Sequence, residues 1–557
     1  MAQSVKRNYI SWILRKIKRR IPTLLFLSLL TMLVSYASVH SALATKGIVN
    51  SALERNHDSV VFFAGLYLVL TVIRFGGNLI LQYLRVNVQE QMERDFKSSI
   101  LKTILQTDYH AISRYHSGDL IQRMNADAGT IYSCIMTVTS NFTYTIIALF
   151  GAVAALLKIA PMFTVVFGII AVIFASTSLI FRKRIRNLSK DSSAASGAMN
   201  GFLHESISKL MVVQALDLAK EMDSRSNRLL DSRWFVRAKQ RNIHLLSTVG
   251  TSVVSFGGHL VTLLWGASQI FAGRLTAGDL TAMTSLVTTI QSSAVTIPMQ
   301  LPQFFAVGAA CDRIMELEAL PRQTDPDPKK ARAMYDTMTG FTADHLTFAY
   351  DRDPVMTDVS LTVPKGGLTV IVGQSGIGKS TLLKLLLGLY RPQSGSLTID
   401  TPDGPVPVDR STRGLFSYAP QGNFLLSGTI RENLTFTNPQ ASEAEIRAAL
   451  HASALDEYID TLPLGLETVL LENGAGLSEG QAQRLSLARA IISGAPVLLL
   501  DEVTSALDAA TEATVLERIC ALPGRTCIAV THRPAALALA TSIIEVTEDG
   551  MTITNCD

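Results

Sequence analysis

Cysteine and charge are both scarce in this sequence. Its 557 residues include five cysteines, which are widely scattered and form neither a CxxC pair nor a His/Cys spacing of the zinc-binding kind. A disulfide framework and a zinc site are therefore not indicated, and Cys520 and Cys527 are expected in a reducing cytoplasmic setting. Charged residues make up 17% of the chain and the formal net charge is +4. That balance does not favour nucleic acid as a partner.

Long apolar runs are abundant instead, and they lie in the first 310 residues. A helix of about 20 mainly apolar residues crosses a bilayer, and six runs fit this description. They cover residues 21–44, 60–84, 131–156, 160–181, 246–271 and 280–304. The first run is longer than the roughly 7–15 apolar residues of a signal peptide, so a retained membrane helix is expected there. We predict an all-α transmembrane bundle of six helices over residues 21–310, preceded by a basic interfacial segment over residues 1–20.

Lysine and arginine are distributed unevenly between the two ends of these predicted spans. Basic clusters within residues 6–20, 182–186 and 237–241 fall on one side, and the opposite side carries only a few basic residues. The positive-inside rule then places the N-terminus and the C-terminal half of the chain in the cytoplasm. The long polar connections, residues 85–130 and 182–245, are predicted to continue the membrane helices on that side.

The chain changes character after residue 310. Residues 311–337, with three prolines and mixed charge, are predicted to form a linker, and residues 338–557 a soluble α/β domain. In that domain an apolar strand runs into a segment that matches G-x-x-x-x-G-K-[ST] and opens a helix. Backbone N–H groups of such loops surround phosphate oxygens, the Lys379 ammonium adds charge and the Ser380 hydroxyl binds Mg²⁺. The predicted ATP contacts in this loop are Gly373, Gln374, Ser375, Gly376, Ile377, Gly378, Lys379, Ser380 and Thr381.

A second apolar strand ends in two acidic residues. Residues 497–500 are Val-Leu-Leu-Leu, and Asp501 and Glu502 follow directly. Ligands of open parallel sheets bind at the carboxyl ends of the strands. One carboxylate is therefore expected to face Mg²⁺ and the other to polarise the attacking water.

With these motifs in this order, the chain resembles the ATP-binding cassette (ABC) exporters, specifically half-transporters with six membrane helices followed by one P-loop ATPase domain. The resemblance covers nearly the whole chain, and it implies ATP and Mg²⁺ as cofactors. It also implies that Asp501 is the Mg²⁺-associated acid, that Glu502 orients or deprotonates the water, and that Gln421 senses Mg²⁺. By the same resemblance His532 contacts the γ-phosphate and Tyr350 stacks on adenine. The residues implied around the metal are Ser380, Gln421 and Asp501.

Leu477–Gln481 resembles the signature sequence of this family, which faces the ATP bound by a second subunit. The resemblance implies that Ser478, Gly480 and Gln481 contact that ATP. Where the family has Gly this chain has Glu479, an acid that either weakens the site by charge repulsion or points into solvent. We expect the second, because Ser478 and Gly480 are intact. The expected partner is a second half-transporter in a homodimer, with a heterodimer as the alternative.

Looser patterns resemble other parts of the family. Ser505–Asp508 is similar to the loop that crosses the dimer interface, and Glu472 to an acid of the exporter coupling loop. Residues near 110–117 and 211–222 are candidates for short helices that seat on the ATPase domains.

Few strongly polar residues lie within the predicted spans. Ionisable groups in a membrane usually face a cavity or another helix rather than lipid. Arg74 and His259 therefore either meet an anionic or polar cargo or pair with neighbouring helices.

The expected function is ATP-driven transport by alternating access in a dimer, with export of a hydrophobic or amphipathic small molecule, lipid or peptide. The expected location is a bacterial inner or plasma membrane, where the chain is an integral protein in contact with the lipid bilayer. Import of a metal chelate on the same scaffold is one alternative. A membrane-anchored regulatory ATPase is another.

Overall fold

The computed structural model describes residues 9–323, 327–350, 354–422, 424–471, 476–547 and 550–556, leaving aside the side chains of residues 169–187 and of a few other helical positions. The chain forms two compact units. The helical unit consists of residues up to Lys102 and of Ser117–Glu318. The α/β unit consists of Thr103–His116 and of the chain from Ala319 onward.

The helical unit contains several helices of more than thirty residues. Its elements are α1 (Tyr9–Lys16), η1 (Lys18–Arg20), α2 (Ile21–Leu53), α3 (His57–Gln106), α5 (Ser117–Gln122), η2 (Arg123–Asp127), α6 (Ala128–Met136), η3 (Thr137–Phe142), α7 (Thr143–Ile159), α8 (Pro161–Ser208), α9 (Leu210–Ala215), α10 (Ala219–Phe271) and α11 (Ala277–Glu318). The six predicted spans lie within helical residues, except that the fourth begins at Ala160, the one residue between α7 and α8. In the described part of the chain, four helical stretches are long and apolar enough to cross a membrane: residues 18–53, 57–106, 117–159 and 219–271.

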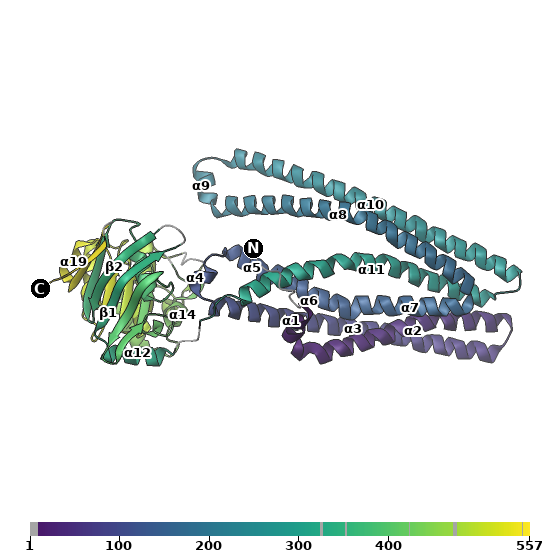
Figure 1. Cartoon of the computed structure of the whole chain (residues 1–557), viewed down its shortest axis with the longest axis horizontal. Helices are drawn as coiled ribbons and strands as arrows, with labels where there is room; N and C mark the ends of the chain where they lie inside the picture. The colour runs from purple at the N-terminus through teal and green to yellow at the C-terminus, as the bar shows by residue number, and fades with distance from the viewer. Residues whose placement is uncertain are drawn as a thin grey trace. The chain divides into compact units, whose positions relative to one another are not determined.

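Small residues let the central helices approach closely. Gly151 on α7 faces Val39 on α2, and a Cβ at this glycine would lie 3.1 Å from a Val39 methyl. Leu156, Met283 and Leu286 are almost fully buried in the same cluster, which joins α2, α7, α8 and α11. Beside this cluster, α8 and α10 run along each other and α9 connects them at one end (Figure 1).

Large apolar side chains are exposed along the outer helices. Phe62 and Phe75 on α3 are more than half exposed, and Phe271 on α10 is 92% exposed. Water would disfavour so much uncovered apolar surface, whereas lipid does not. This surface fits a protein whose helical unit lies in a bilayer.

Charged side chains tie the start of the α5–α7 run to the end of α11. Arg123 is only 6% exposed, and its guanidinium donates to Asp119 at 2.9 Å and to Glu316 at 3.0 Å. Arg313 donates to the buried Asp127 at 2.7 Å. Arg123 and Asp127 bound η2, which is π-helical, as is η3. Each π turn inserts an extra residue into the helix and turns its later side chains.

The α/β unit is built on two sheets. The four-stranded antiparallel sheet has the order β2-β1-β4-β5 and the six-stranded sheet the order β12-β11-β3-β10-β9-β6. The strands are β1 (Gly340–Ala349), β2 (Pro354–Pro364), β3 (Gly367–Gly373), β4 (Ser394–Thr401), β5 (Gly404–Pro407), β6 (Phe416–Ala419), β9 (Val497–Asp501), β10 (Thr526–Val530), β11 (Ser542–Thr547) and β12 (Gly550–Asn555), with a small pair β7 (Gly428–Thr429) and β8 (Val469–Leu470). The helices are α4 (Tyr109–Ile112), α12 (Pro328–Thr337), α13 (Lys379–Leu386), α14 (Ile430–Thr435), α15 (Glu443–Ala452), α16 (Asp456–Thr461), α17 (Glu479–Ile492), α18 (Ala509–Cys520) and α19 (Pro534–Leu539), with short 3₁₀ turns η4 (Arg413–Leu415) and η5 (Gly465–Glu467).

The six-stranded sheet is covered on both faces, which explains its continuous apolar strands. In β9, Val497 and Leu499 pack into one core cluster, and Leu498 and Leu500 pack into the other. Strands β3, β10 and β9 are parallel and in register, so the residues that follow them emerge at one edge of the sheet. This edge gathers the phosphate loop and the two acids.

Residues 103–116 group with the α/β unit although they interrupt the helical unit in sequence. Asp108 caps α4 and its side chain accepts from the His110 backbone N–H. The rings of Tyr109 and His110 both meet the Tyr390 ring edge-on, with centroids 5.6 Å apart in each case. A short helix near residues 110–117 was expected to seat on the ATPase domain, and α4 contacts this domain in the structure.

The connection between the two halves is more helical than its prolines suggest. Helix α11 runs to Glu318 and α12 begins at Pro328, so most of the predicted linker, residues 311–337, is helical.

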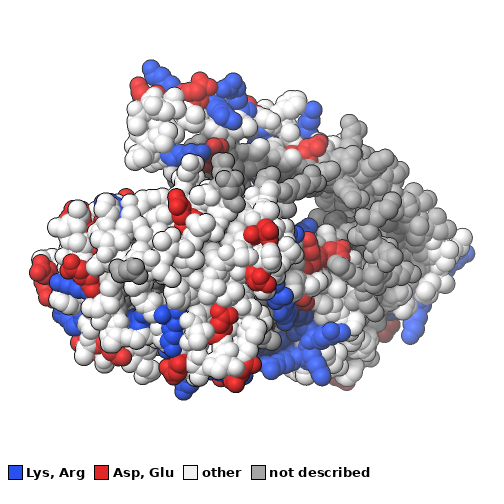
Figure 2. Space-filling model, turned by 60° about the vertical axis from the view of Figure 1, so that its left-hand side comes forward, with Lys and Arg blue, Asp and Glu red and all other residues white. Residues whose placement is uncertain are grey.

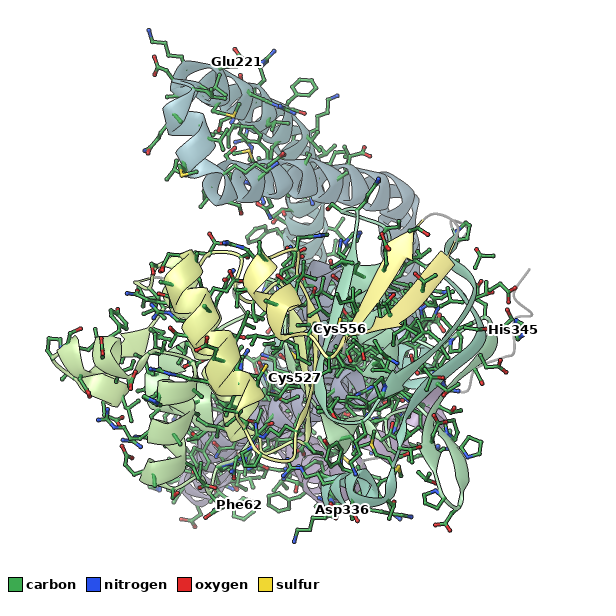
Figure 3. The ribbon with its side chains drawn as sticks, turned by 90° about the vertical axis from the view of Figure 1, so that its left-hand side faces the viewer. Phe62, Glu221, Asp336, His345, Cys527 and Cys556 are labelled. Atoms are coloured by element: carbon green, nitrogen blue, oxygen red, sulfur yellow. The ribbon has the colours of Figure 1, made fainter. Side chains whose placement is uncertain are left out.

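Acidic and basic side chains are intermixed with uncharged ones on the face in Figure 2. The five cysteines are all free. Cys527 lies inside β10, where burial raises the pKa of its thiol to about 12, whereas Cys556 is exposed after β12 (Figure 3).

Candidate nucleotide site

The loop between β3 and α13 has the glycine-dependent backbone of a phosphate cradle. Gly373, Gly376 and Gly378 have φ of 146°, 84° and 111°, values that other residues rarely adopt. A Cβ on Gly373 would lie 2.4 Å from the Val546 carbonyl oxygen. The loop therefore brings its backbone N–H groups to the start of α13, where the helix dipole also favours an anion.

Lys379 is held inside this loop. Its side chain is 6% exposed, and its ammonium donates to the carbonyls of Gly373 and Gln374 at 2.6 and 2.7 Å. Both acceptors are neutral, so the buried positive charge has no carboxylate partner in the described part of the chain. A buried cation in this state favours an anionic ligand.

Asp501 connects the second strand to the phosphate loop. It is 2% exposed and accepts hydrogen bonds from the Ser380 hydroxyl at 2.9 Å and the Tyr418 hydroxyl at 3.0 Å. Burial, followed by the Asp501 charge, raises the pKa of Tyr418 well above its usual value. Among the described residues no basic side chain pairs with Asp501. A buried carboxylate with only hydroxyl partners suits Mg²⁺, which prefers oxygen ligands. Tyr418 was missed as a site residue because its role depends on a contact 83 residues away.

Glu502 has the least usual backbone in the site. Its φ is 51°, a left-handed value that costs energy for a residue with a side chain. The backbone N–H of Glu502 donates to Val530 at 3.0 Å, and its carboxylate accepts from the Gln421 amide at 2.6 Å. The structure thus brings together two residues that the sequence separates by 81 positions.

Tyr350 follows strand β1 and His532 comes shortly after strand β10. The Tyr350 hydroxyl lies 3.1 Å from the Thr381 hydroxyl on α13, and its ring meets Phe348 edge-on. His532 follows β10 and is exposed, and no hydrogen bond or ring contact joins it to another described residue. The adenine and γ-phosphate roles remain predictions for these two side chains.

The signature segment begins α17 with a capping box. The Ser478 hydroxyl accepts from the Gln481 N–H, and the Gln481 side chain accepts from the Ser478 N–H at 2.8 Å. Glu479 occupies the first turn and is exposed, a position where the helix dipole favours an acid. A Cβ on Gly480 would lie 3.0 Å from the Ala506 carbonyl oxygen, so a larger residue has little room. Glu472 lies outside the described residues.

Two polar residues that sequence reasoning missed contact the loop at Ser505, one from α17 and one from the segment after β10. Gln483 on α17 donates to the Ser505 hydroxyl at 3.1 Å and accepts from the Ala506 N–H at 3.2 Å. Arg533, next to His532, donates to the Ser505 carbonyl at 2.6 Å. Nothing in the local pattern distinguishes Gln483 or Arg533 from other polar residues, although Arg533 adjoins a predicted site residue.

The two residues proposed for the cargo cavity differ in their surroundings. Arg74 on α3 donates to the Ser41 hydroxyl on α2 at 3.2 Å, which is a contact between helices. His259 on α10 is partly buried and makes no hydrogen bond with the described residues. The structure does not join them into one site.

Two family models match this chain in sequence order. The model for the ABC transporter transmembrane region matches residues 24–294, and the ABC transporter model matches residues 356–505. Together they cover about three quarters of the chain.

Several curated proteins are similar over most of their length. A mitochondrial potassium channel ATP-binding subunit of Mus musculus is 28% identical over 485 residues, covering 86% of this chain and 67% of the relative. An ATP-dependent lipid A-core flippase of Desulfotalea psychrophila is 28% identical over 506 residues, covering 87% and 86%. A probable multidrug resistance ABC transporter ATP-binding/permease protein of Bacillus subtilis is 27% identical over 505 residues, covering 87% and 84%.

The fold is also found in a solved structure of a bacterial Atm1-family ABC exporter with ATP bound. The TM-score is 0.80 over 96% of this chain and 95% of that one, with 20% sequence identity. At this identity the likeness shows the fold: a helical transmembrane domain followed by an α/β nucleotide-binding domain.

Proposed function

Because this chain belongs to the ABC transporter family and carries both its transmembrane region and its ATPase domain, we propose that it is one half of a homodimeric exporter of a hydrophobic or amphipathic molecule. ATP hydrolysis coupled to transport is the activity of this family. The proposal adds the cargo class, the direction of transport, the identical partner and the roles of single residues. A bacterial inner membrane with the α/β unit on the cytoplasmic side is proposed as the location.

The observation that carries the proposal is the arrangement at the end of β9. Asp501 lies against the phosphate loop through Ser380, and the next residue, Glu502, is a carboxylate without a basic partner among the described residues. In the proposed reaction the oxygen of a water molecule bonds to the γ-phosphorus. The bond to the β–γ bridging oxygen breaks, ADP leaves, and Glu502 takes the water proton.

Mg²⁺, when bound, neutralises charge on the β- and γ-phosphates. Ser380 and Asp501 would hold it, with Tyr418 fixing the second oxygen of the Asp501 carboxylate. Gln421 reaches this place from the loop after β6, where its amide contacts Glu502 in the structure. Opening that contact would free the Glu502 carboxylate for the water, and the amide oxygen of Gln421, which the contact does not use, would face the metal.

The proposed partner supplies the signature segment. Ser478 and Gly480 begin α17 beside exposed surface, where N–H groups of the first helical turn remain available to a phosphate. A homodimer is the simplest arrangement, because one chain carries both an intact phosphate loop and an intact pair of Ser478 and Gly480.

Glu502→Gln tests the chemistry. In lipid nanodiscs this variant should bind ATP as the parent does but hydrolyse it at least about a hundredfold more slowly. Glu517→Gln, an exposed change on α18, is the matched control and should leave the rate unchanged. Normal hydrolysis by Glu502→Gln would rule out Glu502 as the base.

Flux in sealed proteoliposomes tests the direction. Export predicts that, with the α/β unit facing outward, ATP added outside drives a fluorescent lipid or amphipathic dye into the lumen. Movement of a metal chelate in the opposite sense would favour import instead.

A second candidate rests on one relative, the mitochondrial potassium channel ATP-binding subunit. On this model the chain is a membrane-anchored regulatory ATPase that acts on a channel. It predicts hydrolysis that no cargo stimulates, no flux by the chain alone, and ATP-dependent ion conductance only when a channel protein is added.

A further inference from the structure

Glu512, on α18, is a buried acid that the proposed hydrolysis does not use. Its side chain is only 2% exposed, and its two carboxylate oxygens meet different groups. One oxygen accepts a hydrogen bond from the Thr504 hydroxyl at 2.9 Å, and the other lies 3.7 Å from the Arg533 guanidinium. Carboxylates are rarely buried without a partner, and losing that partner leaves an uncompensated charge. The Glu512 carboxylate therefore helps to fix the position of Arg533.

Arg533 also binds the backbone of the loop that precedes α18. One terminal nitrogen of its guanidinium donates to the Ser505 carbonyl at 2.6 Å and to the Leu507 carbonyl at 3.3 Å. The other terminal nitrogen faces Glu512. A planar guanidinium presents its donors in a fixed geometry, which a lysine ammonium at the end of a flexible chain does not reproduce. The loop of residues 504–507 is thus held from one side by Arg533.

The same loop is joined to the signature segment at the start of α17. The Ala506 N–H donates to the Gln483 side chain at 3.2 Å, and that side chain donates to the Ser505 hydroxyl at 3.1 Å. The Ala506 carbonyl oxygen approaches Gly480, where a Cβ would lie 3.0 Å from it. A shift of this loop would therefore displace Gly480 and the first turn of α17.

Arg533 adjoins the predicted γ-phosphate contact of its own chain. His532 precedes it directly, and the Arg533 backbone N–H donates to the Thr531 hydroxyl at 3.1 Å. In the proposed dimer, His532 and the signature segment of one chain face different ATP molecules. Arg533 lies between these two parts of the chain and contacts the loop that joins them.

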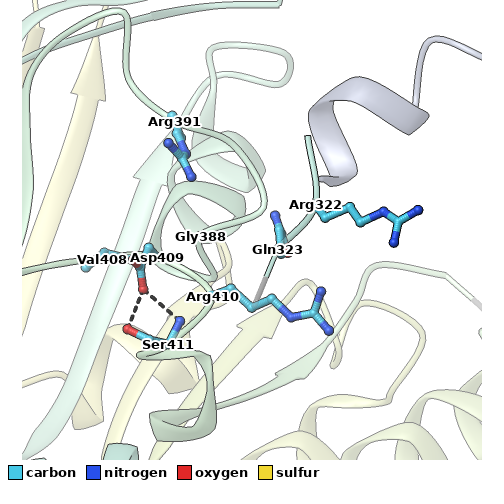
Figure 4. Close-up of a pocket in the computed structure, with 8 residues that line it drawn as sticks. All are labelled: Arg322, Gln323, Gly388, Arg391, Val408, Asp409, Arg410 and Ser411. Carbon is cyan, nitrogen blue, oxygen red and sulfur yellow. Dashed lines mark hydrogen bonds between the residues drawn. The ribbon is translucent and has the colours of Figure 1, made fainter. Parts of the chain in front are cut away.

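Arg533 differs in this respect from the arginines beside Gly388. Arg322, Arg391 and Arg410 line one pocket there, but Figure 4 shows the side chains of Arg322 and Arg410 extending away from Arg391. The Arg533 guanidinium is instead directed at acceptors from two elements, the loop after β9 and α18. Its loss would release a loop, whereas loss of an exposed arginine at the pocket would not.

We propose that Arg533, held by Glu512, is a positioning residue for the ATP bound by the partner subunit. It acts through the loop of residues 504–507, which keeps Gly480 and the first turn of α17 in the place where they meet that ATP. This inference rests on the proposed function, because it requires a nucleotide site shared between two chains. Arg533 thereby influences hydrolysis at a site to which its own phosphate loop does not belong.

Mixed dimers with one hydrolysing site test this action between subunits. Two affinity tags isolate full-length dimers in nanodiscs in which one chain carries Glu502→Gln. Only the site at the other chain's phosphate loop then turns over, and it uses the signature segment of the Glu502→Gln chain. Adding Arg533→Gln to the Glu502→Gln chain should lower hydrolysis at that site about tenfold. The His532 of this chain belongs to the inactive site, so a local disturbance of His532 does not explain such a loss.

The reciprocal placement gives the decisive comparison. Arg533→Gln on the chain with an intact Glu502 lies in the subunit whose signature segment serves the inactive site. The loss there should stay below about threefold. No loss in the first placement, or a loss in the second that equals or exceeds it, would overturn the proposal.

Gly480→Val on the Glu502→Gln chain separates this inference from the proposed function. It should abolish hydrolysis in the mixed dimer, because it disrupts the signature segment that the active site uses. Hydrolysis that survives Gly480→Val contradicts the shared site itself. Loss with Gly480→Val but not with Arg533→Gln contradicts only the role of Arg533.

Two further variants and one further measurement complete the test. Arg391→Gln on the Glu502→Gln chain makes the same chemical change at an exposed arginine and should leave hydrolysis unchanged. Glu512→Gln keeps an acceptor for Thr504 but removes the charge that faces Arg533. It should reproduce the loss in the first placement at about two- to fivefold, and it carries the test if the Arg533→Gln chain does not fold.

Release of labelled ATP from the Glu502→Gln homodimer needs no turnover. Adding Arg533→Gln to both chains should speed this release about tenfold, because the signature segments hold the ATP less well. An unchanged release rate from a folded variant would overturn the proposal.

Discussion

The phosphate loop and the signature segment of this chain differ in how much of a nucleotide site each forms without a partner. At the phosphate loop, Lys379 and Asp501 are 6% and 2% exposed, and their polar atoms already have partners within the chain. At the signature segment, Ser478 and Glu479 are exposed, and the hydrogen bonds there are local caps. On the proposed function, the phosphate loop can bind nucleotide alone because its geometry is preformed, and the signature segment requires a nucleotide bound to another chain.

Lys379→Ala should have the largest effect, because it removes a buried charge from the preformed phosphate loop. Loss of the only buried ammonium in the loop is expected to lower ATP affinity and hydrolysis at least about a hundredfold. Equilibrium binding of a fluorescent ATP analogue and phosphate release would measure this. Lys365→Ala, a lysine of the same unit outside the loop, should change neither.

Gly480→Val should disrupt the signature segment at the start of α17. Its side chain would collide with the Ala506 carbonyl, which lies 3.0 Å from the site of a Cβ. We expect hydrolysis to fall about ten- to a hundredfold while ATP affinity of the separate subunit stays within about twofold, since the phosphate loop is untouched.

Mixing the two variants tests whether each ATP site is shared between two subunits. A heterodimer of Lys379→Ala and Gly480→Val chains contains one site in which the phosphate loop and the signature segment are both intact. Partial recovery of hydrolysis in the mixture indicates sites shared between subunits, and no recovery would contradict the shared site.

Tyr418→Phe should have a moderate effect. It removes the hydrogen bond to Asp501 and is expected to raise the Mg²⁺ concentration needed for half-maximal hydrolysis about three- to tenfold. Because the pKa of Tyr418 is raised in the folded chain, its hydroxyl still donates at pH 10. Its stabilising contribution is fully present below the ordinary tyrosine pKa near 10 and declines as the pH rises above that value. Urea unfolding at pH 8 and pH 11 would show this difference, and Tyr418→Phe should abolish it.

Glu479→Gly should have the smallest effect. The side chain is exposed in the first turn of α17, so water screens its charge from the neighbouring site. The ATPase rate should change by less than about threefold. A rise of tenfold or more would mean that the acid opposes the triphosphate directly.

The sequence predicts well those parts of the molecule that are continuous in the chain. The loop Gly373–Thr381 and the strand before Asp501 carry their own turn residues and apolar runs, so their structures follow from local rules. Tyr418 and Gln483 could not be predicted in the same way, because each acts through a partner more than twenty residues distant. Their roles appear only when parallel strands and α17 bring these partners together.

The end of helix α11 was harder to predict from the sequence for a different reason. Prolines and mixed charge after residue 320 favoured a linker that begins at residue 311, yet the helix continues to Glu318. Val307, Cys311, Ile314 and Leu317 are all buried, and their spacing of three or four residues is that of one helical face. The apolar period over residues 307–317 was the signal for a longer helix, and the downstream prolines outweighed it.

The contact between Gln421 and Glu502 also matters for biogenesis. For the proposed transporter, a newly inserted subunit that meets ATP before it meets a partner has a preformed phosphate loop to bind it. With the proposed general base, Glu502, engaged by an amide 2.6 Å away, such a solitary subunit is expected to bind ATP and not to hydrolyse it until a partner is present.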